Sequence, residues 1–160
     1  MFSLFFIQEI SMIKILFICH GNICRSPMAE FIMKDLVEKS GRQDEFLICS
    51  AATSTEELGN PVHYGTRSIL QRHGISCDGK YARQMTRKDY DEFDLIIAMD
   101  HRNLRNMERF TGGDPDGKVS LLMDYTDRPG SEVADPWYTG DFQKTLDDVL
   151  DGCRGLLETL

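Results

Sequence analysis

A segment near the N-terminus combines a cysteine, an arginine and a serine at a spacing that suits phosphate chemistry. It reads Cys-His-Gly-Asn-Ile-Cys-Arg-Ser-Pro from Cys19 to Pro27, a C-x5-R-S pattern between an apolar run and a predicted helix. A loop that enters a helix N-terminus presents backbone N–H groups and the positive end of the helix dipole to an anion. The segment therefore predicts an anion-binding loop.

The residue types in this loop suit binding and chemistry. Gly21 and Asn22 tolerate left-handed backbone angles, which would let successive N–H groups turn inward. Arg25 can place its planar fork on two oxygens of a phosphate. Ser26 is expected to cap the helix and to donate its hydroxyl to the sulfur of Cys19. The predicted phosphate-binding loop is completed by His20, Ile23 and Cys24.

Cys19 is the predicted nucleophile. Thiols at helix N-termini or beside cations ionise more readily than a free cysteine, so we expect Cys19 to be largely thiolate at neutral pH. Without this context Cys19 would be a buried strand residue and Arg25 a surface charge, because a C-x5-R pattern is common by chance. The strand before it and the Ser-Pro after it favour the phosphate loop, whereas a glutaredoxin-like site would need a C-x2-C pair.

Strands and helices alternate along the rest of the chain. Ile13 to Cys19 is a nearly continuous apolar run, typical of a strand buried on both faces of a parallel sheet. Apolar runs predict further strands at 46–51, 93–99 and 119–123, and helical patterns are found at 26–41, 60–74, 86–89, 103–110 and 142–160. We therefore expect an α/β fold with helices on both faces of the sheet and ligands at the carboxyl ends of the strands.

Two acidic residues follow predicted elements near that edge of the sheet. Asp100 comes after the third strand and is expected to cap the next helix rather than to act in catalysis. Asp135 lies in a long segment, 124–140, that is rich in Asp, Pro and Gly, and such loops are usually functional. On composition alone Asp135 and its proline would form a turn, with Trp137 and Tyr138 as buried loop anchors.

Composition limits the class of protein and its partners. The chain has 160 residues, 41% of them apolar and 28% charged, which is the balance of one compact domain. Eighteen Lys and Arg against 26 Asp and Glu give a net charge of −8, which argues against nucleic-acid binding. The five cysteines are scattered and show no metal-ligand spacing, so we expect a reducing, cytoplasmic compartment and neither disulfides nor a metal site.

The apolar N-terminal stretch is not expected to be a targeting or membrane segment. It lacks a basic start and a small-residue cleavage site, and polar residues interrupt it. Neither secretion nor membrane insertion follows. We expect residues 1–11 to be an extension outside the fold, and residues 12–160 to form a single domain.

The segment from Cys19 to Pro27 resembles the signature of the low-molecular-weight protein tyrosine phosphatases, C-x-G-N-I-C-R-S-P. Further segments are similar in the family's order: Ser50-Ala-Ala-Thr-Ser54, Gly59-Asn-Pro61, Ala82-Arg-Gln84, Ala98-Met-Asp100 and Asp135-Pro-Trp-Tyr138. The resemblance covers residues 12–160. It implies a three-layer α/β fold with a four-stranded parallel sheet, the flavodoxin-like phosphatase I fold. It also implies hydrolysis of phosphotyrosine and other aryl phosphates through a phosphocysteine, with no cofactor and no metal.

The resemblance assigns roles to particular residues. Cys19 would attack phosphorus, Arg25 would stabilise the equatorial oxygens, and Asp135 would protonate the leaving oxygen. Trp137 and Tyr138 would wall a pocket for the phosphotyrosine of a protein or peptide, and inorganic phosphate would be released. The spacing of Cys24 from Cys19 also predicts a reversible disulfide between them after oxidation.

Two positions depart from the family pattern. Lys80 stands where the family commonly has a histidine thought to brace the phosphate loop. Lysine only donates hydrogen bonds, so it could bond the amide oxygen of Asn22 only as a donor. Glu56 stands where the family usually has an aromatic residue. Composition alone predicts a solvated charge there, but the resemblance places Glu56 at the rim opposite Trp137 and Tyr138, where it would disfavour acidic residues beside the phosphotyrosine.

Two other functions could use the same loop. An arsenate reductase would need two further relay thiols after the second helix, and only Cys77 lies near there. A noncatalytic phosphotyrosine-binding module would lack the nucleophile or the acid, and both Cys19 and Asp135 are present. The sequence therefore favours a phosphatase.

Overall fold

Four parallel strands form the centre of the computed structural model, which describes residues 11–160. Their order in the sheet is β2-β1-β3-β4. The strands are β1 (Ile13–Cys19), β2 (Phe46–Ala52), β3 (Leu95–Ala98) and β4 (Val119–Leu121). Their register is regular, with Ile15 of β1 opposite Ile48 of β2 and Leu95 of β3. The predicted four-stranded parallel sheet is confirmed.

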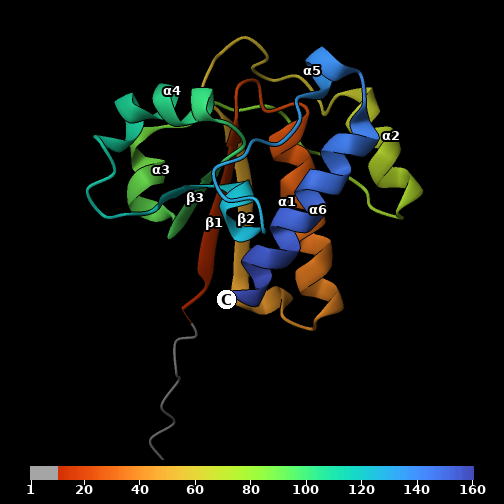
Figure 1. The fold of residues 1–160 in the computed structure, drawn as a ribbon, viewed down its shortest axis with the longest axis horizontal. Helices are drawn as coiled ribbons and strands as arrows, with labels where there is room; N and C mark the ends of the chain where they lie inside the picture. The colour runs from red at the N-terminus through yellow and green to blue at the C-terminus, as the bar shows by residue number, and fades with distance from the viewer. Residues whose placement is uncertain (1–10) are drawn as a thin grey trace, which may run out of the picture.

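Helices cover both faces of this sheet (Figure 1). One face carries α1 (Arg25–Lys39), α2 (Tyr64–Arg72) and α6 (Phe142–Glu158), and the other carries α3 (Arg87–Glu92) and α4 (His101–Thr111). A short helix, α5 (Pro136–Thr139), precedes α6. Two 3-10 turns lie at Gln43–Glu45 and Leu122–Tyr125. The predicted three-layer arrangement is therefore confirmed.

The central strand shows why its sequence is apolar throughout. Successive side chains of a strand point to opposite faces. In β1, Ile15 and Phe17 pack with α1 and α6, while Leu16 and Ile18 pack toward α3 and α4. All four side chains are fully buried. A strand between two helical layers has no face left for polar residues.

Several predicted boundaries are wrong. Helix α1 begins at Arg25 with Cys24 at the N-cap, so Ser26 is not the cap. Helix α2 begins at Tyr64 and not at 60, because Pro61 forms an antiparallel bridge with Tyr81 before the helix starts. The fourth strand ends at Leu121, where the chain turns into a 3-10 helix. The predicted short helix after Thr86 and the last helix are confirmed.

The carboxyl ends of the strands form one edge of the molecule. Strand β1 rises in Figure 1 from the N-terminal side to this edge, where α5 and the N-terminal ends of α1 and α4 gather. The chain runs from β1 to β2 on one side of β1, and then crosses from β2 to β3 and β4 on the other side. Open α/β sheets bind ligands at such a switch in strand order.

The terminal segments add two observations. Residues 1–10 lie outside the described part of the chain, so all of the predicted extension except Ser11 falls there. Within residues 11–160, no helix is long and apolar enough to cross a membrane.

Candidate active site

The loop after β1 turns at Asn22. This residue has a left-handed φ of 59° and is buried. Gly21, expected to share this conformation, does not have a left-handed φ. A side chain there would place its Cβ 3.3 Å from Cγ of Glu57, a close approach that the Glu57 side chain would have to relieve by a small shift. The loop therefore depends on one left-handed residue and one close approach.

Two groups of the loop contact the sulfur of Cys19. The N–H of Asn22 donates to Sγ at 3.3 Å, and Oγ of Ser26 lies 2.9 Å from Sγ. The side-chain amide of Asn22 donates to the same Ser26 oxygen at 2.8 Å. Because the Ser26 oxygen already accepts a hydrogen bond from Asn22, the hydroxyl hydrogen of Ser26 is free to point to the sulfur. Ser26 therefore does not cap the helix, and its hydroxyl contacts the sulfur of Cys19 instead.

A buried network holds Asn22 from beneath. Its amide nitrogen also donates to Oγ of Ser50 at 2.9 Å, and its amide oxygen accepts the N–H of Arg83 at 3.2 Å. The hydroxyl of Ser50 donates to Glu30 at 2.7 Å. This network connects the phosphate loop to β2, to α1 and to the segment after α2. The turn at Asn22 is therefore held from three parts of the chain.

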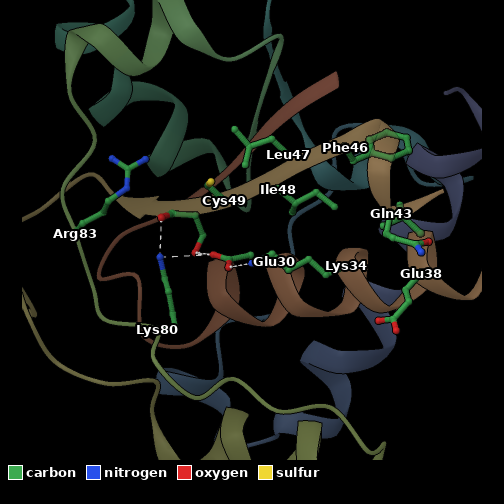
Figure 2. A pocket seen from close by; sticks show the side chains of 12 residues that line it. Glu30, Lys34, Glu38, Gln43, Phe46, Leu47, Ile48, Cys49, Lys80 and Arg83 are labelled. Carbon is green, nitrogen blue, oxygen red and sulfur yellow. Dashed lines mark hydrogen bonds and ion pairs between the residues drawn. The ribbon is translucent and has the colours of Figure 1, made fainter. Parts of the chain in front are cut away.

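Lys80 joins the network at a different place from the one predicted. It does not reach Asn22 and instead donates to the carbonyl oxygen of Ser50 at 2.8 Å. Its Nζ lies 3.5 Å from Oε1 of Glu30, beside a cavity of about 480 Å³ along the outer edge of β2 (Figure 2). Burial lowers the pKa of Lys80, and the charge of Glu30 opposes this. Lys80 braces the loop through Ser50 and Glu30.

Arg25 is clamped by acidic and carbonyl oxygens. Its guanidinium is almost fully buried and lies 2.9 Å from Asp100 and 3.3 Å from Asp135. It also donates to the carbonyl of Val133 at 3.2 Å. Burial alone would lower the pKa of Arg25, but the charges of Cys19, Asp135 and Asp100 outweigh it and raise the pKa. The guanidinium is therefore held in place in the cavity that Cys19 also lines.

Asp100 does more than the sequence suggested. It caps α4 by accepting the N–H of Asn103 at 2.7 Å, as predicted. Its second oxygen binds Arg25, a contact that sequence reasoning missed. The position of Asp100 at the carboxyl end of a strand, on the same edge as Cys19, was the available signal.

Asp135 reaches the loop from the far end of the chain. It caps α5 by accepting the N–H of Trp137 at 3.0 Å, and its other oxygen faces Arg25. Val133, two residues before Asp135, donates its N–H to the carbonyl of Met99 at 2.9 Å. Asp135 can therefore form the turn predicted from its Asp-Pro sequence and also lie beside Arg25, as the general-acid role implied by the resemblance would require.

A cavity of about 560 Å³ joins these groups. Trp137 and Tyr138 line it and are 68% and 77% exposed, so the alternative reading of them as buried anchors is wrong. Asn22 and Ser26 lie beneath the loop and do not line the cavity. The other predicted site residues all line it: Cys19, His20, Gly21, Ile23, Cys24, Arg25 and Asp135.

The rim of this cavity carries a contact between His20 and Glu56 that the sequence did not indicate. Nε2 of His20 lies 2.9 Å from Oε2 of Glu56. The Glu56 side chain is 69% exposed, and both residues line the same cavity as Trp137 and Tyr138. Glu56 therefore stands at the rim, as expected, with an imidazole beside it in place of the missing aromatic wall.

Cys24 lies in the floor of the same cavity and is a free thiol. Burial, with the charge of Cys19 next, raises the pKa of Cys24 to about 12. At neutral pH it is therefore a neutral thiol beside the predicted nucleophile.

Comparisons with known proteins agree with this geometry. A family model for the low molecular weight phosphotyrosine protein phosphatase matches residues 14–160. The low molecular weight protein-tyrosine-phosphatase YfkJ of Bacillus subtilis (strain 168) is 43% identical over 150 residues, which cover 93% of this chain and 96% of that protein. The low molecular weight phosphotyrosine protein phosphatase of Homo sapiens is 38% identical over 149 residues, covering 91% and 94%. The crystal structure of YfkJ superimposes with a TM-score of 0.89, covering 93% of this chain and 94% of that one.

Proposed function

Because this chain belongs to the low molecular weight phosphotyrosine protein phosphatase family and is a protein tyrosine phosphatase, we propose that it hydrolyses phosphotyrosine through a phosphocysteine on Cys19. One observation carries the proposal. Cys19, Arg25 and Asp135 line the same cavity, Arg25 lies 3.3 Å from Asp135, and the hydroxyl of Ser26 lies 2.9 Å from the Cys19 sulfur. A nucleophile, a cationic fork and a carboxyl group thus converge on one point.

In the first step Cys19 attacks phosphorus. A bond forms between sulfur and phosphorus, and the bond from phosphorus to the tyrosine oxygen breaks. Arg25 and the loop N–H groups stabilise the charge on the equatorial oxygens, and Asp100 fixes the guanidinium before substrate arrives. Protonated Asp135 gives its proton to the departing oxygen, so that tyrosine leaves as a neutral phenol.

In the second step water releases the phosphate. Asp135, now a carboxylate, takes a proton from the water that attacks phosphorus. The bond from phosphorus to sulfur breaks, and inorganic phosphate leaves. The hydroxyl of Ser26 donates to the departing sulfur, because Asn22 already occupies the serine oxygen as a donor. Cys19 returns as a thiolate.

The cavity walls favour an aryl phosphate. Trp137 and Tyr138 present exposed aromatic faces to the cavity. Offset or edge contacts between aromatic rings contribute about 0.5–1.5 kcal/mol beyond burial. A shorter phosphoserine would leave these faces uncovered. Glu56, which lines the same cavity, adds a negative charge, so peptides with basic or neutral residues beside the phosphotyrosine are the preferred substrates.

Oxidation of Cys19 would engage Cys24. Peroxide converts the Cys19 thiolate to a sulfenic acid. The Cys24 thiol then displaces water to form a disulfide, giving up its proton in the step. This bond protects Cys19 from further oxidation until a thiol reduces it.

The alternative functions have less support. A relay of thiols, as in an arsenate reductase, would need cysteines near Cys19 besides Cys24. Cys77 is buried in the core and is not among the residues lining the cavity. A binding module without chemistry has no use for a carboxyl group held beside the arginine, as Asp135 is.

Acid quenching of the enzyme during turnover of a phosphotyrosine peptide tests the proposal. We expect covalent phosphate on Cys19, and none in Cys19→Ser, which should still bind vanadate because the loop donors remain. Cys49→Ser, which changes a half-buried cysteine outside the cavity, is the matched control and should turn over normally. Turnover by folded Cys19→Ser would refute the phosphocysteine.

A further inference from the structure

We infer that Asp148, a residue of α6 outside the cavity, positions the loop that carries Asp135. The inference rests on the proposed role of Asp135 as the general acid. The observations behind it are the contacts of Ala134, the residue that immediately precedes Asp135.

Asp148 is a buried carboxylate with three donors. It is only 2% exposed, and its Oδ2 accepts the backbone N–H of Ala134 at 3.0 Å. Its Oδ1 accepts from Lys144 at 2.8 Å and from Arg128 at 3.2 Å. Buried carboxylates are rare unless they are paired and hydrogen-bonded. One oxygen is committed to two cations and the other to the loop backbone.

The same residue of the loop is held at its carbonyl as well. Oγ1 of Thr145, one turn of α6 before Asp148, donates to the carbonyl of Ala134 at 2.8 Å. Two side chains of α6 therefore fix both polar groups of Ala134. On its other side Val133 is bonded to Arg25 and to the carbonyl of Met99. The chain entering Asp135 is held between the phosphate loop and α6.

The charge on Asp148 matters for this contact. Burial alone would raise the pKa of Asp148, but the hydrogen bonds from Lys144, Ala134 and Arg128 outweigh it and hold the pKa below its usual range. The side chain of Asn has one oxygen and one NH₂ group. Its NH₂ group would therefore face either the two cations or the N–H of Ala134, and a donor would then meet a donor. Asn therefore cannot make all three contacts that Asp makes.

Loss of this anchor should act on the chemistry of Asp135. A misplacement of about 1 Å from a change outside the reacting groups can cost about 10²-fold in rate. Proton donation matters most when the leaving oxygen is strongly basic. The loss should therefore be larger for phenyl phosphate and phosphotyrosine than for p-nitrophenyl phosphate, whose leaving group needs little assistance.

The test compares Asp148→Asn with Asp147→Asn, a neighbouring exposed residue of α6 whose carboxylate accepts a hydrogen bond from Gln143. Single-turnover phosphorylation is measured with phenyl phosphate and with p-nitrophenyl phosphate. For Asp148→Asn we expect about a tenfold or greater loss with phenyl phosphate, a smaller loss with p-nitrophenyl phosphate, and little change in KM. Asp147→Asn should behave as wild type. A loss equal for both substrates, or no loss, would overturn the inference.

Two further variants keep the result interpretable. Thr145→Val removes the bond to the Ala134 carbonyl with little change in volume, and should show the same leaving-group dependence if Asp148→Asn fails to fold. In Asp135→Ala, adding Asp148→Asn should cost no further activity, because both act through one group. If Asp135→Ala itself lacks leaving-group dependence, the proposed role of the acid fails. If it shows that dependence and Asp148→Asn does not, only the present inference fails.

Discussion

Replacing Glu56 by Gln should change which phosphotyrosine peptides the enzyme prefers. The Glu56 carboxylate is 2.9 Å from His20 and lines the same cavity as Trp137 and Tyr138. Gln keeps the size of the side chain and removes only its charge. Acidic residues beside the phosphotyrosine should then be penalised less, and basic ones should lose an advantage.

The expected magnitude is small and follows from exposure. The Glu56 side chain is 69% exposed, so solvent screens its interactions strongly. Exposed charge pairs contribute about 0.2–1 kcal/mol. At about 1.4 kcal/mol per tenfold, each charged flanking residue should change kcat/KM by about 1.4- to 5-fold.

Paired peptides measure this effect. We would compare kcat/KM for phosphotyrosine peptides that differ only in a flanking Lys or Glu, at about 10 mM and about 1 M salt, where the Debye length falls from about 30 to about 3 Å. The Lys-to-Glu preference of wild type should shrink at high salt and in Glu56→Gln. Glu158→Gln is the control, because it changes net charge equally at an exposed position near the C-terminus, away from the cavity.

Two results would refute this reasoning. If Glu56→Gln and Glu158→Gln alter the peptide preference equally, total charge and not the rim determines it. If neither changes the ranking at low salt, the Glu56 carboxylate does not face the substrate. Glu56→Trp adds a second arm: it should lower KM for phosphotyrosine peptides more than it raises kcat, through a new aromatic contact.

Three other changes probe the site and its support. Asp135→Ala should lower kcat by about 10²–10⁴-fold with little change in KM and flatten the alkaline limb of the pH profile. Normal kcat of Asp135→Asn on phenyl phosphate would point instead to Glu132, a carboxylate that lines the same cavity. Cys24→Ser should make peroxide inactivation harder to reverse with dithiothreitol, and because the pKa of Cys24 is raised to about 12, disulfide formation in wild type should accelerate with pH; equal recovery of both proteins would mean that Cys24 only packs. Because the pKa of Asp148 is lowered in the folded protein, its ionised carboxylate stabilises the fold above the usual Asp pKa range, and this stabilisation is lost as pH falls through the lowered value. Urea unfolding should therefore show that the loss of unfolding free energy caused by Asp148→Asn shrinks from neutral pH to about pH 2. A loss that stays constant over this range would contradict the assignment.

Local patterns were enough to predict the sheet and the turn that leads from β1 into α1. The apolar run of β1 and the residues from Cys19 to Pro27 act over short distances in sequence, where strand burial, a turn and a helix start are decided by neighbours. The exact starts of elements were less predictable. Asn60-Pro61 has the chemistry of a helix start, but Pro61 pairs with Tyr81 instead, and this tertiary contact delays α2 to Tyr64.

The partners of each site residue were decided by the tertiary structure. Arg25 meets the carbonyl of Val133 across 108 positions of sequence, and Asn22 meets the backbone of Arg83 across 61. Lysine chemistry allowed Lys80 to donate, but only packing decides that Ser50 and Glu30 receive it. The sequence spacing suggests the pair of Lys144 with Asp148, four positions apart, but not the contact of Asp148 with the N–H of Ala134 in the loop before α5. Residue types determine which bonds a side chain can make, and the fold determines which atoms come within hydrogen-bonding distance.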